Sequence, residues 1–499
     1  MVNRSLRLLV PRMCAIALTF SSCAIFRPAG RPSDPLAALR YDIDQVLADS
    51  IFTPARAGIK VISSNSREVI YERDSKLLMR PASNMKLITS STALHLLGKD
   101  YRFRTSVYAD TTVTDSLLDG NLYIKGFGNP DLATADLDSL AGQIRSLGVK
   151  YITGGVIADV TFFDDVYWGY GWNWDDEPSS YAAFITALSV NDNCVKVSVS
   201  PGPTSGDSVQ VSVDPPTSYV SIVNKGKTVS DTVLHRLSVT RLYKERSNTI
   251  LIEGEMLPDA RPVERQLSVW KPELYTATLF TEALQRNSIS VAKAPALGQA
   301  PGSGREIAVH LQRIDSTIIN MNKVSDNLTA EMLLKTLDAV SNNVPGSSEG
   351  GICLVNQFLS SLGIDTLKYR ITDGSGLSYH NLITAEMIVQ LLEGMQHQTD
   401  VFPLFYESLP IAGVDGTIRN RMKKTPAEGN LRAKTGTISG VSSLSGYVQT
   451  LDDERLIFSM SMQNFIYPAR YYQRAQDKIG AILAGFSRWW LARFRFGPA

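Results

Sequence analysis

Apolar positions near the start of the chain recur first at helical and then at strand spacing. Residues 36–50 carry them at intervals of three and four, which predicts a helix. Two short apolar runs, 58–63 and 68–72, flank a polar turn and predict a hairpin. Residues 83–97 predict a second helix, which begins at a serine and ends before Gly98.

The hydrophobic pattern of the chain changes from helical to strand-like spacing at about residue 103. Short β-like segments separated by Gly, Pro, Asn and Asp continue to about residue 272, at 121–125, 151–158, 194–200, 208–213, 218–223, 237–242 and 248–254. Helical spacing returns at 273–286, 315–340, 350–362 and 383–397, and two apolar strands follow at 441–449 and 454–463, before a last helix from about 468. This order predicts an α/β (α+β) domain interrupted by a large, mostly β insertion.

The N-terminal segment predicts export. Three arginines precede the short apolar stretch 14–20, and Ser21 and Ser22 stand directly before Cys23. This order is typical of a signal peptide, here residues 1–22. Cys23 resembles the acylated cysteine of a bacterial lipoprotein, and plain signal-peptidase cleavage nearby is the alternative.

Residues 23–36 contain several Pro and Gly residues and predict a tether between the anchor and the fold. No other apolar run approaches the roughly 18 residues of a membrane-spanning helix. We therefore expect an exported, periplasmic protein that contacts the membrane only through a lipid on Cys23.

Composition narrows the class of protein. A chain of 499 residues predicts about three domains. Fifty basic and 49 acidic side chains leave a net charge of +1, which argues against a nucleic-acid partner. Five scattered histidines and four cysteines show no metal-ligand spacing, so we expect neither a metal site nor a cofactor.

The pattern Ser-x-x-Lys occurs three times, at 83–86, 268–271 and 290–293. Prolines close behind the second and third lysines keep those pairs from opening a helix. Ser83 does begin a predicted helix, where positions i and i+3 share a face, so the Lys86 amine can reach the Ser83 hydroxyl. Such an amine can act as the base for a serine nucleophile where burial and nearby positive charge lower its pKa.

Two further motifs follow in order. Lys434-Thr435-Gly436-Thr437 offers a second cation, and its glycine would let a substrate lie along a strand edge. Ser325-Asp326-Asn327 stands between two helical stretches. The ordered set of three motifs is the signature of active-site-serine penicillin-interacting enzymes.

Beyond these motifs the chain resembles the D-alanyl-D-alanine carboxypeptidase/endopeptidase family of penicillin-binding protein 4 type, the class C low-molecular-mass penicillin-binding proteins. The resemblance runs from about residue 40 to 465, through the matching stretches 81–87, 171–176, 373–378 and 409–417. It implies a β-lactamase/transpeptidase-like serine domain with a five-stranded antiparallel sheet flanked by helices. We expect this domain at 37–105 and 306–499, with an insertion at 106–305 that forms two small domains.

The resemblance also implies roles. Ser83 would be the acylated nucleophile and Lys86 its base, while Ser325 and Asn327 would relay protons and hold the substrate amide. The remaining motif residues, Lys434, Thr435, Gly436 and Thr437, would bind the terminal carboxylate. The implied substrates are peptidoglycan stem peptides and their cross-links, with β-lactams as covalent inhibitors.

A specificity pocket is implied by Trp172, Asp175, Asp176 and Tyr181, whose acids would attract a free amino group of the stem peptide. The arginine that often follows the 373–378 stretch in this family is Tyr379 here. The alternative is a buried tryptophan beside a solvated acidic loop.

Other functions remain open at this point. A serine β-lactamase uses the same motifs together with a glutamate-activated water, and a non-catalytic β-lactam or peptidoglycan receptor would be acylated without turnover. An α/β-hydrolase is disfavoured because no Gly-x-Ser-x-Gly elbow occurs. Cys194 and Cys353 either pair in an oxidising compartment or are both buried thiols.

Overall fold

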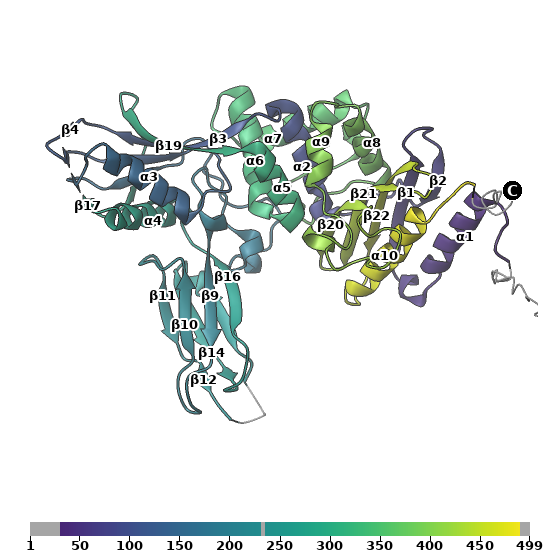
Figure 1. Cartoon of the computed structure of the whole chain (residues 1–499), viewed down its shortest axis with the longest axis horizontal. Helices are drawn as coiled ribbons and strands as arrows, with labels where there is room; N and C mark the ends of the chain where they lie inside the picture. The colour runs from purple at the N-terminus through teal and green to yellow at the C-terminus, as the bar shows by residue number, and fades with distance from the viewer. Residues whose placement is uncertain (1–29, 231–234, 490–499) are drawn as a thin grey trace, which may run out of the picture.

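The computed structural model describes residues 30–230 and 235–489. The predicted signal peptide, Cys23 and the first part of the predicted tether lie outside these residues. Figure 1 shows a sheet with helices around it at one end of the long axis, a second α/β part at the other end, and a strand-rich part that projects from the second.

The first part is built on one antiparallel sheet, as predicted. Its order is β2-β1-β22-β21-β20, with β1 at Arg56–Ser63, β2 at Val69–Arg73, β20 at Arg432–Ile438, β21 at Val441–Gln449 and β22 at Arg455–Gln463. All four neighbouring pairs are antiparallel. The predicted hairpin and the two C-terminal strands are confirmed, and β20 is the edge strand that carries the Lys-Thr-Gly motif.

Helices cover both faces of this sheet. Alternate residues of β22 point to opposite faces, so that Phe458 and Met460 pack with α1 (Pro35–Leu47) and α10 (Arg470–Ala484), whereas Ile457 packs on the other side. The helices of that second side are α2 (Met85–Leu97), α5 (Ile314–Asn320), α6 (Asn327–Asn342), α7 (Ser348–Ser361), α8 (Ala385–Gln396) and α9 (Phe402–Ser408). The sheet is thus the middle layer of a three-layer domain.

Helix α1 begins within the predicted tether. Its first residue is Pro35, and the Asp34 side chain accepts a hydrogen bond from the Ala37 amide at 2.7 Å, which caps the helix. Arg31 forms a bidentate ion pair with Asp42 of the same helix. The described end of the tether is therefore attached to the fold.

The second part contains a mixed sheet in the order β18-β8-β6-β3-β19. Its strands are β3 (Arg102–Ala109), β6 (Leu122–Gly126), β8 (Val156–Asp159), β18 (Ala296–Leu297) and β19 (Arg305–Arg313). A smaller sheet, β17-β7-β5-β4, uses Ser290–Val291, Tyr151–Ile152, Leu117–Leu118 and Val113–Thr114. The predicted boundaries at residues 105 and 306 fall inside the paired strands β3 and β19, and the division into domains stays a prediction.

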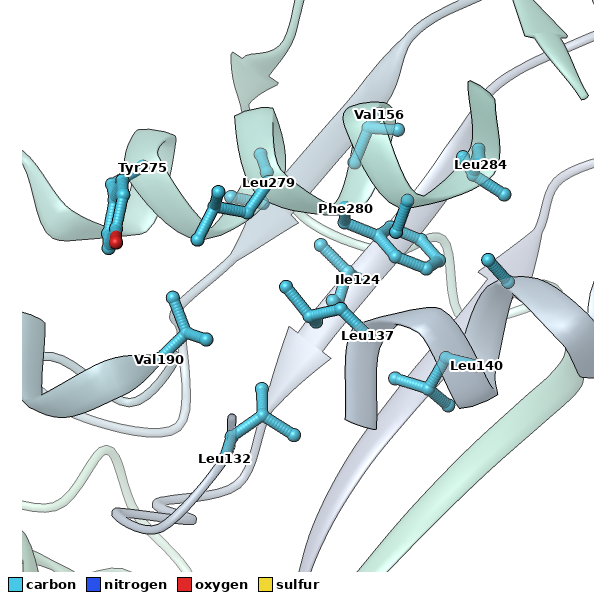
Figure 2. Close-up of a cluster of buried hydrophobic side chains, with 14 of the residues drawn as sticks. Ile124, Leu132, Leu137, Leu140, Val156, Val190, Tyr275, Leu279, Phe280 and Leu284 are labelled. Carbon is cyan, nitrogen blue, oxygen red and sulfur yellow. The ribbon is translucent and has the colours of Figure 1, made fainter. Parts of the chain in front are cut away.

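Two helices pack on this mixed sheet, α3 (Thr134–Ser146) and α4 (Pro272–Arg286). Figure 2 shows Leu137 and Leu140 of α3 gathered with Phe280 and Leu284 of α4 over Ile124 of β6. Helix α4 matches the predicted segment, whereas α3 lies within the stretch that was expected to be mostly β and was not predicted as a helix. The inserted region is therefore less purely β than its sequence texture predicts.

The projecting part is built from strands, with one short 3₁₀ turn, η6 (Tyr243–Glu245), among its described residues. One sheet is β10-β9-β16, at Gln210–Asp214, Cys194–Ser200 and Val263–Ser268. The others are β11-β14-β13, at Ser221–Asn224, Thr249–Glu253 and Ser238–Arg241, and the pair β12-β15, at Lys227–Thr228 and Glu255–Met256.

The two candidate cysteines do not pair. Cys194 is buried at the start of β9, where burial raises the pKa of its thiol, and Cys353 is exposed on α7. Both open interpretations are thus wrong, because the residues form no disulfide and only one of the two is buried.

Three carboxylates meet where the inserted region packs on α6. Burial raises the pKa of Asp192 to about 7, and the negative charges of Asp326 and Asp131 add to the effect. Asp326 is fixed there because it caps α6, accepting hydrogen bonds from the amides of Leu328 and Thr329. Ionised Asp192 therefore opposes the native packing of the junction.

This arrangement predicts a pH-dependent stability. An unfolded aspartate has a pKa of about 3.9, so the folded protein binds the Asp192 proton up to higher pH than the unfolded chain does. The associated stability is present below about pH 4 and is lost as the pH rises to about 7. We expect Asp192→Asn to raise Tm by about 1–3 °C at pH 8 and to change it little at pH 4.5, as measured by calorimetry. Asp115→Asn is a matched control, since Asp115 is exposed and also has a positive φ of 51°, against 55° for Asp192. An equal shift at both pH values would contradict the prediction.

Candidate active site

The predicted nucleophile lies in a short 3₁₀ turn, η2 (Ala82–Asn84), and the α-helix α2 begins just after it, at Met85. Ala82 has a φ of 48°, in the left-handed region that alanine seldom occupies. The Lys86 ammonium, one turn further on, lies 3.0 Å from the Ser83 hydroxyl oxygen and donates to it. The i, i+3 contact expected from the sequence is therefore present.

The sheet face beneath this turn is lined with serines. Ser443 of β21 donates to the Pro81 carbonyl at 2.7 Å, and Asn84 donates to Ser445 at 2.6 Å. Gly436 of β20 lies against the same turn, where a Cβ would come within 2.7 Å of the Pro81 carbonyl oxygen and 2.9 Å of the Ser83 nitrogen. Close packing therefore requires a glycine at this position of Lys-Thr-Gly, because a side chain there would displace the nucleophile.

Lys86 is fully buried and held by three acceptors. Besides Ser83, its Nζ donates to Asn327 Oδ1 at 2.5 Å and to the Ser375 carbonyl at 2.8 Å. Burial lowers the pKa of Lys86 to about 8, although nearby carboxylates, Asp326 foremost, act in the opposite direction. An amine with this pKa can accept a proton near neutral pH.

A second lysine–serine pair faces the first. Lys434 is buried, and its Nζ donates to Ser325 Oγ at 2.7 Å and to the Thr435 carbonyl at 3.0 Å. Burial, and then the positive charge of Lys86, lower the pKa of Lys434 well below its ordinary value. Ser325 ends a π-helical turn, η7 (Met321–Ser325), with a φ of 69°. Strained backbone of this kind clusters at functional sites.

The segment 409–417 supports the edge strand. Lys323 forms an ion pair with Asp415 at 2.7 Å and also donates to the Leu409 carbonyl. Thr435 of β20 then donates to the hydroxyl of Thr417 at 2.8 Å. The 409–417 stretch, which carries part of the family resemblance, therefore supports β20 at Thr435 of the Lys-Thr-Gly motif.

Two buried acids organise the loop beside Lys86. Asp373 accepts hydrogen bonds from the Gly376 and Ser378 amides, and Glu331 accepts from the Gly374 and Ser375 amides. The pKa of Glu331 is raised to about 7 by burial and by the charge of Asp373. The sequence predicts no role for either acid, although Asp373 is the first residue of the 373–378 stretch that carries part of the family resemblance.

A cavity of about 400 Å³ opens between these groups. Its lining includes the predicted residues Ser83, Asp176, Tyr181, Ser325, Asn327 and Thr437, together with Asn173, Gly376, Leu377, Tyr379, Ile438 and Ser439. Lys86, Lys434 and Gly436 do not line the cavity and are buried. The three sequence motifs therefore converge on one cavity.

Two predicted pocket residues do not line the cavity. Trp172 is buried, and its indole N–H donates to Asp373 at 3.0 Å, so it supports the loop beside Lys86 instead. Asp175 is exposed on the outer side of its turn. Asp176 does line the cavity, where it accepts from the Tyr181 hydroxyl at 2.8 Å.

Within residues 30–230 and 235–489, no group of three or more His, Cys, Asp or Glu side chains is placed to hold a metal ion. The described helices also include none long and apolar enough to cross a membrane.

The cavity is surrounded by two serine–lysine pairs and an asparagine, and it lies beside the edge strand of an antiparallel sheet. This arrangement defines an active-site-serine enzyme of the penicillin-interacting class. Comparison with known proteins agrees with this class. Residues 39–484 match the D-Ala-D-Ala carboxypeptidase 3 (S13) family, and the chain belongs to this family of serine peptidases.

The similarity to known relatives covers most of the chain. The D-alanyl-D-alanine carboxypeptidase of Actinomadura sp. strain R39 is 35% identical over 467 residues, which is 91% of this chain and 85% of that protein. DacB of Haemophilus influenzae is 28% identical over 79% of this chain and 82% of its own length. The crystal structure of penicillin-binding protein 4 from the same organism superposes with a TM-score of 0.79 at 25% identity, covering 89% of this chain and 99% of that one. The β-lactamase/transpeptidase-like fold and the D-Ala-D-Ala carboxypeptidase class expected from the sequence are confirmed.

The pKa of Lys86 predicts the pH profile of acylation. With a pKa of about 8, only about one tenth of Lys86 is neutral at pH 7. We expect the second-order rate of β-lactam acylation to rise between pH 6 and 8 and to level off above about pH 8, as measured by stopped-flow with a chromogenic β-lactam. Lys86→Arg should fold normally and lose acylation, because a guanidinium does not release its proton in this range. A flat profile, or a near wild-type rate in Lys86→Arg, would remove Lys86 from the role of base.

Proposed function

We propose that this chain is a serine D-alanyl-D-alanine carboxypeptidase, with endopeptidase action on cross-links, that cleaves peptidoglycan stem peptides through an acyl-enzyme at Ser83. The observation that carries this proposal is the 3.0 Å contact between Lys86 Nζ and Ser83 Oγ at the cavity wall, opposite the Lys434–Ser325 pair. One pair supplies a nucleophile and its base, and the other supplies a proton donor beside a cation.

The proposed reaction has two steps. Ser83 Oγ attacks the carbonyl carbon of the penultimate D-alanine while Lys86 takes the hydroxyl proton. The C–N bond then breaks, and the leaving amine of the terminal D-alanine receives a proton through Ser325, whose hydroxyl lies 2.7 Å from Lys434. Water hydrolyses the resulting ester, which returns the Ser83 hydroxyl and releases the shortened peptide.

Charge in this reaction would be stabilised at two places. Lys434, Thr435 and Thr437 would bind the terminal carboxylate, and Asn327 would hold the substrate amide. The backbone N–H groups of Ser83 and Thr437 would form the oxyanion hole, where one such donor contributes about 3–4 kcal/mol to transition-state stabilisation.

Asp176 and Tyr181 form the proposed specificity subsite. Both line the cavity, and so does Tyr379, in the position where the family often has arginine. A carboxylate at this wall would attract the free amino group of a cross-linking residue. We expect β-lactams to act as covalent inhibitors at Ser83. Simple β-lactams lack a side-chain amino group, so Asp176 and Tyr181 would contribute little to their binding.

The remaining parts of the proposal concern location. We propose that the chain is exported to the periplasm through residues 1–22 and is held at a bacterial membrane by a lipid on Cys23. The motif around Cys23 supports this step, and mass spectrometry of the N-terminal peptide from the membrane fraction tests it.

Labelling tests the nucleophile. After brief exposure to penicillin, the intact protein should gain the mass of one β-lactam, and peptide mapping should place the adduct on Ser83. Ser83→Ala should abolish it, because the hydroxyl is the attacking group. The other two Ser-x-x-Lys serines are internal controls: Ser268 is buried and donates to the Glu177 carbonyl, and Ser290 is exposed on β17. An adduct on either would overturn the assignment.

Turnover separates this proposal from its competitors. The enzyme should release D-alanine from a stem pentapeptide at steady state. Rapid turnover of β-lactams instead would indicate a β-lactamase, and stoichiometric acylation without release of D-alanine would indicate a receptor.

Single substitutions test the subsite. Asp176→Ala should lower kcat/KM about tenfold, or ~1.4 kcal/mol, on stem peptides that carry a free side-chain amino group, because the cavity-facing charge is lost. The rate of acylation by simple β-lactams should change little. Asp175→Ala is the matched control, since Asp175 is next in sequence and faces solvent. Equal losses on both substrates would mean that Asp176 acts through the fold of its loop.

A further inference from the structure

A second hollow lies behind the turn that forms one wall of the catalytic cavity. It has a volume of about 480 Å³, and its lining is mostly aromatic: Trp168, Trp174, Phe184, Tyr243 and Trp270, with Glu177, Lys244 and Arg246. We call it the aromatic groove. Trp174 is exposed, Trp168, Tyr243 and Trp270 are half-buried, and Phe184 closes the floor as a buried ring. A partly open aromatic surface of this kind marks a candidate interaction site.

The rings in the aromatic groove are arranged as two ordered groups. Trp168, Phe184 and Trp270 form one continuous run, with centroid distances of 5.3 Å and 5.1 Å. Trp174 and Tyr243 form the other, 6.0 Å apart and tilted by 30°. Trp174 is 66% exposed, so most of its surface is open to a ligand.

Charge at the rim of the groove is positive. Lys244 Nζ lies 5.6 Å from the Trp174 ring centroid, and the Arg246 guanidinium lies 5.4 Å from that of Trp270. The acid of the lining, Glu177, is paired with buried Arg241 at 2.6 Å. The two rim cations therefore remain available to an anionic or hydroxyl-rich ligand.

The aromatic groove and the catalytic cavity share one turn. In a 3₁₀ helix, side chains three residues apart lie above one another. Around η3 (Trp174–Asp176), Asn173 and Asp176 therefore face the catalytic cavity, whereas Trp174 and Glu177 face the aromatic groove. A single ligand that crosses this turn could therefore occupy both the catalytic cavity and the aromatic groove.

We propose that the aromatic groove binds the glycan strand to which the stem peptide is attached. A chain of N-acetylated hexosamines presents flat C–H faces that stack on aromatic rings, and hydroxyl and acetamide edges that suit the rim cations. An extended peptide would instead need a row of backbone donors and acceptors, which the ring faces do not provide. The proposal rests on the proposed function, since it concerns the polymer that carries the same substrate.

Peptide-free glycan strands are the direct probe. Isothermal titration of the whole protein with such strands, prepared by removing all stems from peptidoglycan, should show binding. Trp174→Ala should weaken it about tenfold, as removal of a central aromatic anchor does at other interfaces. Trp489→Ala is the matched control, because Trp489 is 65% exposed and lies outside the groove, and it should change the affinity less than twofold. Lys244→Glu, at the exposed rim, is a second variant that should also weaken binding. Absence of binding by the wild type, or equal weakening in Trp489→Ala, would overturn the proposal.

Activity measurements separate this inference from the proposed function. In Trp174→Ala, release of D-alanine from a free stem peptide should stay within twofold of wild type, whereas KM for intact, glycan-linked peptidoglycan should rise severalfold at unchanged kcat. A matching loss on the free peptide would place the groove in the peptide subsite and overturn the glycan assignment. If the wild type released no D-alanine from any peptide, the proposed function would fail while the titration with glycan strands still decided the groove.

Discussion

Burial of the Lys86 ammonium beside Ser83 is the constraint on which the rest of the site depends. A buried charge is costly unless hydrogen bonds replace its water shell, and Lys86 has three acceptors within 3.0 Å, from Ser83, Asn327 and the Ser375 carbonyl. Each acceptor comes from a different segment of the chain, so one nitrogen ties together the turn η2, the start of α6 and the loop at Ser375. The same burial that demands these partners lowers the pKa of Lys86 and makes it able to accept a proton.

Close packing of backbone follows from this constraint. The turn bearing Ser83 is pressed between β20 on one side and the loop after Asp373 on the other, and both contacts need glycine. A Cβ at Gly376 would lie 1.8 Å from the Ala82 carbonyl oxygen, and one at Gly436 would lie 2.7 Å from that of Pro81. The glycines and the small serines of β21 are thus part of the catalytic geometry even though they carry no reacting group.

Sequence patterns predicted the elements of the first part of the chain well, because alternation and helical spacing there coincide with burial. Helix α3 was missed although Leu137, Leu140 and Ile144 recur at helical spacing, since the short strands around it dominated the local texture. The 151–158 strand splits at Gly154 into β7 and β8, which join different sheets. The spacing of apolar residues indicates that a segment is buried on one side, but it does not indicate which sheet the segment joins.

The site was predictable only in part. Motif order and the family resemblance predicted Ser83, Lys86, Ser325 and Lys434 as site residues. The structure brings these four side chains together although Ser325 and Lys434 are 109 residues apart. The resemblance grouped Trp172 and Asp175 with Asp176 in one pocket, yet Trp172 is buried against Asp373 and Asp175 is exposed, so that of the three only Asp176 lines the cavity. Glu331 was missed because it acts on backbone amides, and a lone glutamate within a helix gives no signal in a sequence.

The inserted region is more than an appendage, because it determines how Asn327 is oriented. The Asn327 side-chain N–H₂ donates to the Tyr181 carbonyl at 2.7 Å, and this contact directs its oxygen toward Lys86 at 2.5 Å. With the amide reversed, the Asn327 N–H₂ group and the Lys86 ammonium, both hydrogen-bond donors, would face each other across this contact, which a buried ammonium cannot tolerate. The loop of the inserted region therefore selects the amide orientation that keeps Lys86 in place beside Ser83. Since the same loop carries Asp176 into the cavity, the wall that would recognise the substrate and the contact that orders the base are held by one segment.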